Sequence, residues 1–384
     1  MRTDGKQRII GALMGDLTLD PGTRTKYGLF FKAVQSHFPL VEVYDARLRG
    51  FDRLWNAALT FHPNQEFWRE RFYKNIPAFK KRSQNLAKRI MQMQHQADLI
   101  LQVGVLFDSS WGDIQIPSLV YTDYTALLSS QKPAAGRSPF TQEELRQWID
   151  LERRVFQRAG HICTRSLFVR DSIVQDYQIP AERVSVVGGG VNFPQVPVPV
   201  QHIQTDQPTA LFIGKEFYRK GGDLLLRAFA EVRQKIPNAR LLFLTEGKIP
   251  PHLPLEGVEW IKPTWDRKFI QSLYRQSQIF VLPSRLETWG DVLLEAMSCG
   301  LPCVGVSGQA MEELIIDGTT GMIVSPEDEK SLAEAMLRLF NNPALRMELG
   351  QSAYQRTQKE FTWECVAERI AQVVSESNGF RRRG

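Results

Sequence analysis

The sequence predicts an α/β protein built from two doubly wound, Rossmann-like parallel sheets. Three observations support this prediction: the chain has 384 residues, short apolar runs alternate with longer amphipathic stretches, and one proline-rich segment lies near the middle. A chain of this length corresponds to two domains at roughly 100–200 residues each. The alternation of strand-like and helix-like segments is typical of parallel sheets covered by helices on both faces.

Each expected sheet is a series of short apolar runs that read as buried strands. The first series is expected at 9–13, 41–44, 99–106, 118–121, 161–164 and 184–187. The second series is expected at 209–213, 240–244, 258–261, 279–282, 303–306 and 322–324. Apolar residues at helical spacing separate the strands, for example at 222–235 and 330–340.

These elements predict four segments. We expect an N-terminal domain at 1–190, a semi-rigid proline-rich linker at 191–208, a second domain at 209–362, and a helix with a basic tail at 363–384. Two doubly wound sheets joined by one linker face a central cleft, formed by the carboxyl ends of both sets of strands. Ligands bind at such edges in open α/β sheets.

Composition excludes several classes of protein. A hydrophobic fraction of 43% with 23% charged residues is far from the composition of disordered chains. The four cysteines form no CxxC pair, and Cys299 and Cys303 are interpreted as buried thiols in a reducing compartment. No apolar run approaches the roughly 18 residues that span a bilayer. We therefore expect a cytoplasmic protein that is soluble or peripheral on the inner face of the membrane.

The net positive charge of the chain comes from its first half. Residues 1–200 contain 26 Lys and Arg against 19 Asp and Glu, whereas residues 201–384 contain 22 against 23. Such an asymmetry suggests that one domain faces an anionic partner.

A segment at 284–297 carries two glutamates that are expected in different elements. It follows the strand expected at 279–282, and Gly290 with Asp291 reads as the turn and N-cap of a helix. Glu287 then lies in the strand-to-helix loop, and Glu295 lies one turn inside the helix. Loop amides and the positive end of that helix suit an anion such as a diphosphate. Those amides belong to Thr288, Trp289 and Gly290.

A similar loop follows the strand expected at 209–213. Gly214 permits a close backbone approach, and Arg219 and Lys220 place cations where a phosphate leaving group would develop charge. We expect this loop and the loop at 284–290 to face one another across one cleft. For each loop alone, a solvated turn or an ordinary helix remains an equally simple interpretation.

Together these blocks resemble a known family. The run Glu287-x7-Glu295 lies within PSRLETWGDVLLEAMSCGLPCVG, which LFIGKEFYRKGGDLLLRAF precedes and MEELIIDGTTGMIVSP and FTWE follow. In this order and spacing, over about half the chain, they resemble the donor domain of retaining glycosyltransferase family 4 (glycosyl transferases group 1), which has the GT-B fold. The resemblance implies metal-independent transfer of a hexose from a nucleotide-diphosphate sugar, with retention. It also implies that the helix after FTWE crosses back to the first domain.

The resemblance implies a role for each matching residue. Glu295 is expected on the ribose hydroxyls of the donor nucleotide, and Glu287 is expected near the transferred sugar. Lys220 is expected on the diphosphate with Arg219 beside it, and Gly214 matches the glycine after the first strand of the donor domain.

Some residues depart from the family pattern. Asp291 stands where the family often has an apolar or small residue, and it is interpreted as a helix cap turned away from the phosphates. Lys215 stands where many members have arginine, which keeps the charge but loses the bidentate fork. The chain has no Asp-x-Asp motif, so we expect no metal cofactor, with cations and a helix N-terminus stabilising the diphosphate instead.

The first half resembles the family more loosely. Gly22 and Thr23, after the first expected strand, are candidates for a flexible loop that approaches the donor. Many members carry a histidine after the strand expected here at 118–121, and this chain has Asp123 in that region. Asp123 is therefore a candidate for the polar group over the reacting sugar. A strand-end aspartate that caps a turn is an equally good interpretation.

A basic segment interleaved with aromatic residues lies at 67–89. This pattern suits an anionic membrane surface or a lipid-linked, phosphate-bearing acceptor. A solvated helix face with a buried aromatic edge is the commoner explanation. Nucleic acid is not expected as a partner, because no binding module is recognised. The candidate surface residues are Arg69, Arg71, Lys80, Lys81 and Arg82.

The sequence thus predicts an enzyme that moves a hexose from a nucleotide sugar to a glycan, lipid-linked or small-molecule acceptor. Two alternatives remain open at this point. One is a nucleotide-sugar-binding or scaffold protein that keeps the GT-B fold without turnover. The other is a sugar-nucleotide epimerase of the same fold, which would convert the donor without an acceptor.

Overall fold

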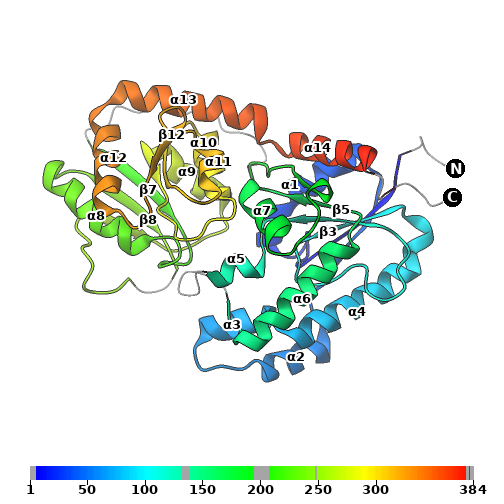
Figure 1. The fold of residues 1–384 in the computed structure, drawn as a ribbon. Helices are drawn as coiled ribbons and strands as arrows, with labels where there is room; N and C mark the ends of the chain where they lie inside the picture. The colour runs from blue at the N-terminus through cyan, green and yellow to red at the C-terminus, as the bar shows by residue number, and fades with distance from the viewer. Residues whose placement is uncertain (1–5, 132–137, 194–206, 247–248, 378–379, 381–384) are drawn as a thin grey trace. The chain divides into compact units, whose positions relative to one another are not determined.

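The computed structural model describes residues 6–131, 138–193, 207–246, 249–377 and 380. The chain divides into two units: Met1–Gly188 with Trp363–Gly384, and Gly189–Thr362. Figure 1 shows the first unit from blue to green with the red C-terminal helix, and the second from green to orange. Most of the predicted linker, at 194–206, and the basic tail at 381–384 lie outside the described residues.

The first unit is built on a six-stranded parallel sheet with the order β2-β1-β3-β4-β5-β6. Every strand predicted for this half is present. The strand predicted at 99–106 ends earlier, at Val103, because Gly104 adopts a φ of 79°, which an extended strand does not allow. The strands are β1 Ile9–Leu13, β2 Leu40–Asp45, β3 Leu99–Val103, β4 Ser118–Thr122, β5 His161–Thr164 and β6 Val184–Val186.

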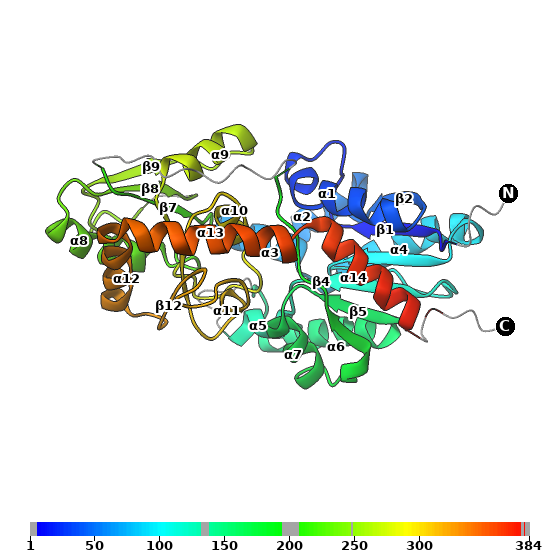
Figure 2. The same cartoon turned by 90° about the horizontal axis from the view of Figure 1, so that it is seen from above.

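Helices cover both faces of this sheet because its strands carry buried apolar side chains on both faces. Ile9 belongs to the same core cluster as α1 and α14, whereas Ile10 packs in a separate cluster with α4. On the α1 side, Phe30 stacks on Tyr121 with ring centroids 4.8 Å apart. Figure 2 shows α14 lying over this sheet. The helices are α1 Pro21–His37, α2 Gly50–Leu59, α3 Gln65–Tyr73, α4 Ile76–Met93, α5 Ala126–Gln131, α6 Gln142–Arg158, α7 Leu167–Gln175 and α14 Trp363–Glu376.

The second unit contains a six-stranded parallel sheet with the order β12-β11-β10-β7-β8-β9. All six predicted strands are present with small changes at their ends. The strands are β7 Thr209–Ile213, β8 Arg240–Leu244, β9 Val258–Ile261, β10 Ile279–Val281, β11 Cys303–Val306 and β12 Gly321–Val324. The helices are α8 Gly222–Lys235, α9 Arg267–Gln276, α10 Asp291–Ser298, α11 Met311–Leu314, α12 Glu329–Asn341 and α13 Pro343–Glu360.

Local sequence signals start several of these helices. Thr141 and Glu144 form a capping box at the start of α6, and Asp266 accepts the amides of Lys268 and Phe269 at the start of α9. None of the helices in the described ranges is long and apolar enough to cross a membrane.

Candidate active site

The order of strands in the second sheet creates a topological switch point between β7 and β10. These two strands are parallel neighbours, and the chain leads away from them toward opposite edges of the sheet. Loops that follow such strands leave an opening at the carboxyl edge, where ligands bind in doubly wound folds. The two loops are 214–221 after β7 and 282–290 after β10, which are the loops that the sequence singled out.

The structure brings these two loops into direct contact. The amide of Arg285 donates to the carbonyl oxygen of Arg219 at 2.8 Å, and the Ser284 hydroxyl donates to the same oxygen at 3.2 Å. In return, Nη1 of Arg219 donates to the carbonyl oxygen of Leu286 at 2.8 Å. The loops therefore form one joined structure in the second unit.

Lys220 and Glu287 form an ion pair at this junction. The Lys220 ammonium donates to Oε2 of Glu287, and the two side chains are 13% and 9% exposed. The amide of Glu287 donates to Oε1 of Gln309 at 2.5 Å, and Nε2 of Gln309 donates to the Ser284 carbonyl oxygen at 2.7 Å. Gln309, which the sequence did not reveal, thus fixes the loop that carries Glu287.

Arg219 has a positioning role in the described loops. Its guanidinium contacts both carboxylate oxygens of Glu216, at 2.5 Å and 3.2 Å, in addition to the Leu286 carbonyl oxygen. A guanidinium engaged on three sides holds the two loops together. Its predicted contact with a diphosphate stays a prediction.

Glu295 lies on α10 in a nearly enclosed position, at 4% exposed. Its Oε1 accepts from Nη2 of Arg267 at 2.6 Å, and its Oε2 accepts from the Tyr274 hydroxyl at 3.1 Å. Burial raises the pKa of Glu295, and Arg267 opposes that effect by favouring the charged form. Arg267 also lies over the Phe193 ring, 4.5 Å from its centroid.

Sequence reasoning missed Arg267 and Tyr274. The two residues lie on α9, seven positions apart, so they share one face of that helix. Helical spacing is therefore the signal that could have grouped them. Nothing local to α9 indicates that this face meets Glu295, because the contact joins residues that are distant in the sequence.

Gly214 and Lys215 follow β7 directly. A Cβ at Gly214 would lie 2.6 Å from Cζ of Phe212 and 2.7 Å from Cβ of Lys220, so only glycine permits this close approach. Lys215 is exposed, and its Nζ lies 4.1 Å from the ring centroid of Trp265. Its predicted role in binding the donor stays a prediction.

The start of α10 corrects one expectation. Asp291 was predicted to cap this helix, but Gly290 is the N-cap, with a φ of 108°, and Asp291 is the first helical residue. The N-cap of α10 is in the left-handed conformation, in which any residue with a side chain would be strained. Glycine therefore occupies this position instead of Asp291. Asp291 also raises the pKa of Glu295 by its charge. An acid therefore lies in the first turn of α10.

The loop before α10 carries one large aromatic side chain, that of Trp289. The Trp289 side chain is buried and packs edge-on against Phe361, with ring centroids 5.8 Å apart. The predicted anion contacts at Thr288, Trp289 and Gly290 therefore concern backbone amides, and they stay predictions.

Asp123 in the first unit follows β4 and is a charged carboxylate. Its Oδ2 lies 3.2 Å from Nζ of Lys26 and 3.8 Å from Nη1 of Arg165. Burial alone would raise the pKa of Asp123, but the two cations outweigh burial and hold the pKa well below its usual range. This carboxylate accepts hydrogen bonds well and is a poor base.

Gly22 and Thr23 do not form the flexible loop that was predicted. Both lie in the first turn of α1, where Oδ1 of Asp20 accepts from the Gly22 amide at 3.0 Å and the Thr23 amide at 3.4 Å. Pro21 at the first helical position and the Asp20 cap explain why the chain is helical here.

The predicted basic surface is only partly a surface. Arg69, Lys80 and Lys81 are exposed, whereas Arg71 is half-buried and contacts Oε1 of Glu144 at 3.4 Å. Arg82 was predicted on the same surface and is instead buried in the first unit, at 1% exposed. Helical position explains the difference, because Arg82 lies on the face of α4 that contains the buried residues Phe79, Ser83 and Leu86.

The described ranges contain no group of three or more His, Cys, Asp or Glu side chains that could hold a metal ion. Cys299 and Cys303 are free and buried, as the sequence predicted.

Comparisons with known proteins find similarity over the part of the chain that carries this site. Residues 198–356 match the model of a family described as "Glycosyl transferases group 1". The D-inositol 3-phosphate glycosyltransferase of Streptomyces coelicolor is 28% identical over 319 residues, which are 73% of this chain and 68% of that protein. The glycogen synthase of Mycobacterium tuberculosis is 26% identical over 236 residues, 59% of this chain and 57% of that protein. The match to this relative thus covers little more than half of its length.

Solved structures show the fold. A sucrose-phosphate synthase from Thermosynechococcus elongatus superimposes with a TM-score of 0.70 at 18% identity, over 96% of this chain and 99% of that one. The predicted GT-B fold class, with two Rossmann-like doubly wound units, is confirmed. The match to group 1 over residues 198–356 agrees with the family that the motifs predicted.

Proposed function

We propose that this chain, whose residues 198–356 match glycosyl transferases group 1, is a retaining glycosyltransferase of family 4. It moves a hexose from a nucleoside-diphosphate sugar to a hydroxyl group of a glycan, a lipid-linked acceptor or a small molecule. The observation that carries the proposal is the contact between Lys220 and Glu287, which joins the loops after β7 and β10 at the switch point of the matching segment.

Lys220 is the group that meets the diphosphate. Its ammonium is paired with Glu287. A diphosphate carries more negative charge than one carboxylate. Donor binding would draw Lys220 onto the phosphate oxygens and release Glu287 to accept hydrogen bonds from the sugar hydroxyls. The amides of 288–290 and the positive end of α10 add to the same electrostatic field.

Glu295 binds the nucleoside part of the donor. Arg267 and Tyr274 fix its carboxylate, and each oxygen has a remaining lone pair that can accept from a ribose hydroxyl. A carboxylate held in this way binds a diol without a large loss of side-chain entropy, because its rotamer is already fixed.

The proposed reaction needs only groups that the chain and the substrates supply. The bond between the anomeric carbon and the diphosphate oxygen breaks, and its electron pair leaves with the diphosphate. The acceptor oxygen forms the new bond on the same face of the sugar and gives its proton to the departing diphosphate. Asp123 is not assigned the role of base, because its low pKa keeps it charged and unsuited to proton abstraction.

A donor screen tests this proposal. The full chain is incubated with a panel of nucleotide sugars, and binding is followed by thermal shift. We expect one donor to stabilise the protein. With a chelator present, the sugar of that donor should be transferred, or the donor should be slowly hydrolysed. Nucleotide binding without transfer or hydrolysis would support a binding protein, donor conversion without an acceptor would support an epimerase, and no binding to any nucleoside diphosphate would reject the proposal.

Two variants separate the roles of the acids. Glu295→Gln should weaken nucleotide binding about tenfold, because a neutral amide loses the charge-assisted hydrogen bonds. Glu287→Gln should leave nucleotide binding within about twofold and lower the transfer rate about a hundredfold, because Glu287 contacts the transferred sugar and not the nucleotide. Glu334→Gln on the exposed face of α12 is the matched control and should change neither quantity.

A further inference from the structure

A pocket of about 310 Å³ lies in the first unit, at the carboxyl edge of β1 and β2. All its walls come from residues between 14 and 82, so the pocket belongs to this unit alone. It differs from the candidate site in the second unit, which is built on another sheet. The lining residues are Met14, Asp16, Leu19, Asp45, Arg47, Leu48, Arg49, Arg53, Phe72, Tyr73 and Arg82.

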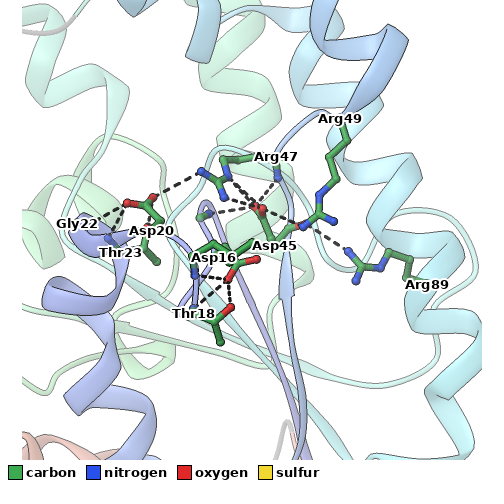
Figure 3. A network of polar contacts seen from close by, with 11 residues as sticks. Asp16, Thr18, Asp20, Gly22, Thr23, Asp45, Arg47, Arg49 and Arg89 are labelled. Atoms are coloured by element: carbon green, nitrogen blue, oxygen red, sulfur yellow. Dashed lines mark hydrogen bonds and ion pairs between the residues drawn. The ribbon is translucent and has the colours of Figure 1, made fainter.

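The acids of the pocket are already engaged. The Asp45 carboxylate accepts from Nε of Arg47 at 3.0 Å and from Nη2 of Arg49 at 3.2 Å, as Figure 3 shows. Asp16 accepts from the hydroxyl and amide of Thr18 and from the amide of Leu19, and these hydrogen bonds lower its pKa to about 2. Four arginines line the pocket against two aspartates, so positive charge exceeds negative charge.

Arg82 is the unusual member of this set. Its guanidinium donates to the carbonyl oxygens of Tyr73 at 2.7 Å and Phe72 at 3.2 Å, and its Nε is buried with no hydrogen-bond partner in the described ranges. No carboxylate from the described part of the chain lies within 4.0 Å of it. Burial lowers the pKa of Arg82 to about 10, which leaves it charged at neutral pH. A buried charge without a counter-ion is costly, and a bound anion would remove that cost.

We propose that this pocket binds a phosphomonoester group, with Arg82 at its inner wall and Arg49 and Arg53 at its rim. Guanidinium forks match the oxygens of a phosphate group, and a phosphomonoester carries about −1.5 to −2 charge at pH 7. A single carboxylate would leave part of the positive charge unpaired. If the phosphate group belongs to the sugar acceptor, that identification rests on the function proposed above. Binding of the phosphate group by itself does not depend on that function.

The phosphate group has two chemical sources, a soluble phosphate ester and a lipid headgroup. Helix α2, which carries Arg53, also exposes large apolar side chains: Phe51 is 77% exposed and Trp55 is 63% exposed. Their rings stack with centroids 6.4 Å apart. These side chains could contact the apolar part of a lipid, so both sources must be compared.

The first experiment measures binding of inorganic phosphate to the full chain by calorimetric titration, with potassium chloride at equal ionic strength as the reference. We expect saturable binding that Arg53→Ala weakens about tenfold and that Arg82→Lys, which keeps the charge but loses the fork, weakens similarly. Arg53 is exposed, so its variant is expected to fold normally. Arg146→Ala on the exposed face of α6 is the matched control and should bind phosphate as the unchanged protein does.

Three outcomes would overturn the proposal. The first is no saturable binding beyond that of chloride. The second is an equal loss of phosphate binding in the Arg53 and Arg146 variants, which would indicate diffuse attraction to charge. The third is weaker phosphate binding in Lys220→Ala with unchanged phosphate binding in Arg53→Ala, which would place the phosphate in the second unit.

A second experiment distinguishes the sources and separates the two proposals. Glycerol 3-phosphate and phosphatidylcholine vesicles with or without phosphatidic acid are the probes. Binding to glycerol 3-phosphate that depends on Arg53 assigns a soluble ligand, and sedimentation with phosphatidic acid vesicles that depends on Arg53 assigns a lipid. Binding to neither probe would reject the proposal that this pocket binds a phosphomonoester group. Nucleotide binding measured on the same samples tests the second unit independently, so either proposal can fail alone.

Discussion

Glu152 is a carboxyl group that the first unit buries completely, at 0% exposed. Its oxygens accept from the Ala126 amide at 2.9 Å, from Nε1 of Trp148 at 3.0 Å and from the Tyr177 hydroxyl. Burial raises its pKa to about 7, and the three donors only partly oppose this effect. The folded protein therefore retains a proton on Glu152 that the unfolded chain loses near pH 4.5.

This shift predicts a loss of stability as the pH rises. Between about pH 4.5 and pH 7 the folded state binds more protons than the unfolded state, so the free energy of unfolding should fall by on the order of 3 kcal/mol. Glu152→Gln removes the titrating group, and its stability relative to the unchanged protein should therefore rise across this range. Chemical denaturation at several pH values measures the difference.

The control for this experiment is Glu143→Gln, on the same helix and exposed to solvent. It makes the same substitution at an exposed position, so its stability across the pH range is the reference for Glu152→Gln. A constant difference for Glu152→Gln would show that Glu152 is ionised in the folded protein at pH 5–6.

At the scale of elements, the start of α8 is fixed by a contact between two backbones. Gly221 is the N-cap of α8 and has a φ of 72°, and a Cβ there would lie 2.0 Å from the carbonyl oxygen of Pro283 at the end of β10. Lys220 directly precedes this glycine, so the contact also determines where Lys220 stands relative to Glu287.

Gly221→Ala should therefore destabilise the second unit by about 3 kcal/mol or more, since strain at positive φ costs about 1–2 kcal/mol and displacing a backbone adds to it. Gly308→Ala is the matched control, because Gly308 has a φ of 79° but no atom within 4 Å of the added Cβ. The control should lose only about 1–2 kcal/mol. Equal losses in the two variants, measured by urea denaturation, would contradict the proposed backbone contact.

At the scale of the whole molecule, the chain returns to its first unit after completing the second. Helix α14 supplies Trp363, Val366 and Ile370 to the core that contains Phe30 of α1. The Trp363 and Phe30 rings lie 5.3 Å apart between centroids. The first unit therefore needs the last helix of the chain to complete its apolar core.

Ile370→Ala should destabilise the first unit by about 2–5 kcal/mol, because it removes buried methyl groups from a position that is 1% exposed. Hydrogen exchange should show lost protection in β1 and β3, with β7 and β8 unchanged. Gln372→Ala, on the exposed face of α14, should cost less than about 0.5 kcal/mol. Loss of protection confined to the second sheet would contradict the assignment of α14 to the first unit.

The sequence alone determined the two series of strands, the helices that follow β7 and β10, and the loops that bear Lys220, Glu287 and Glu295. These features follow from local patterns, because apolar periodicity, glycine and strand-to-helix turns act over a few residues. The family resemblance rested on the same blocks.

Only the tertiary structure decided what each side chain meets. Arg82 belongs to a run of basic residues and is nevertheless buried, because its position on α4 turns it toward the unit's interior. Arg267 reaches Glu295 from another helix, and Asp45 joins Arg47 and Arg49 in a network beside Asp16. Such contacts depend on how distant segments pack, and burial then sets their charge states, so no local pattern could predict them.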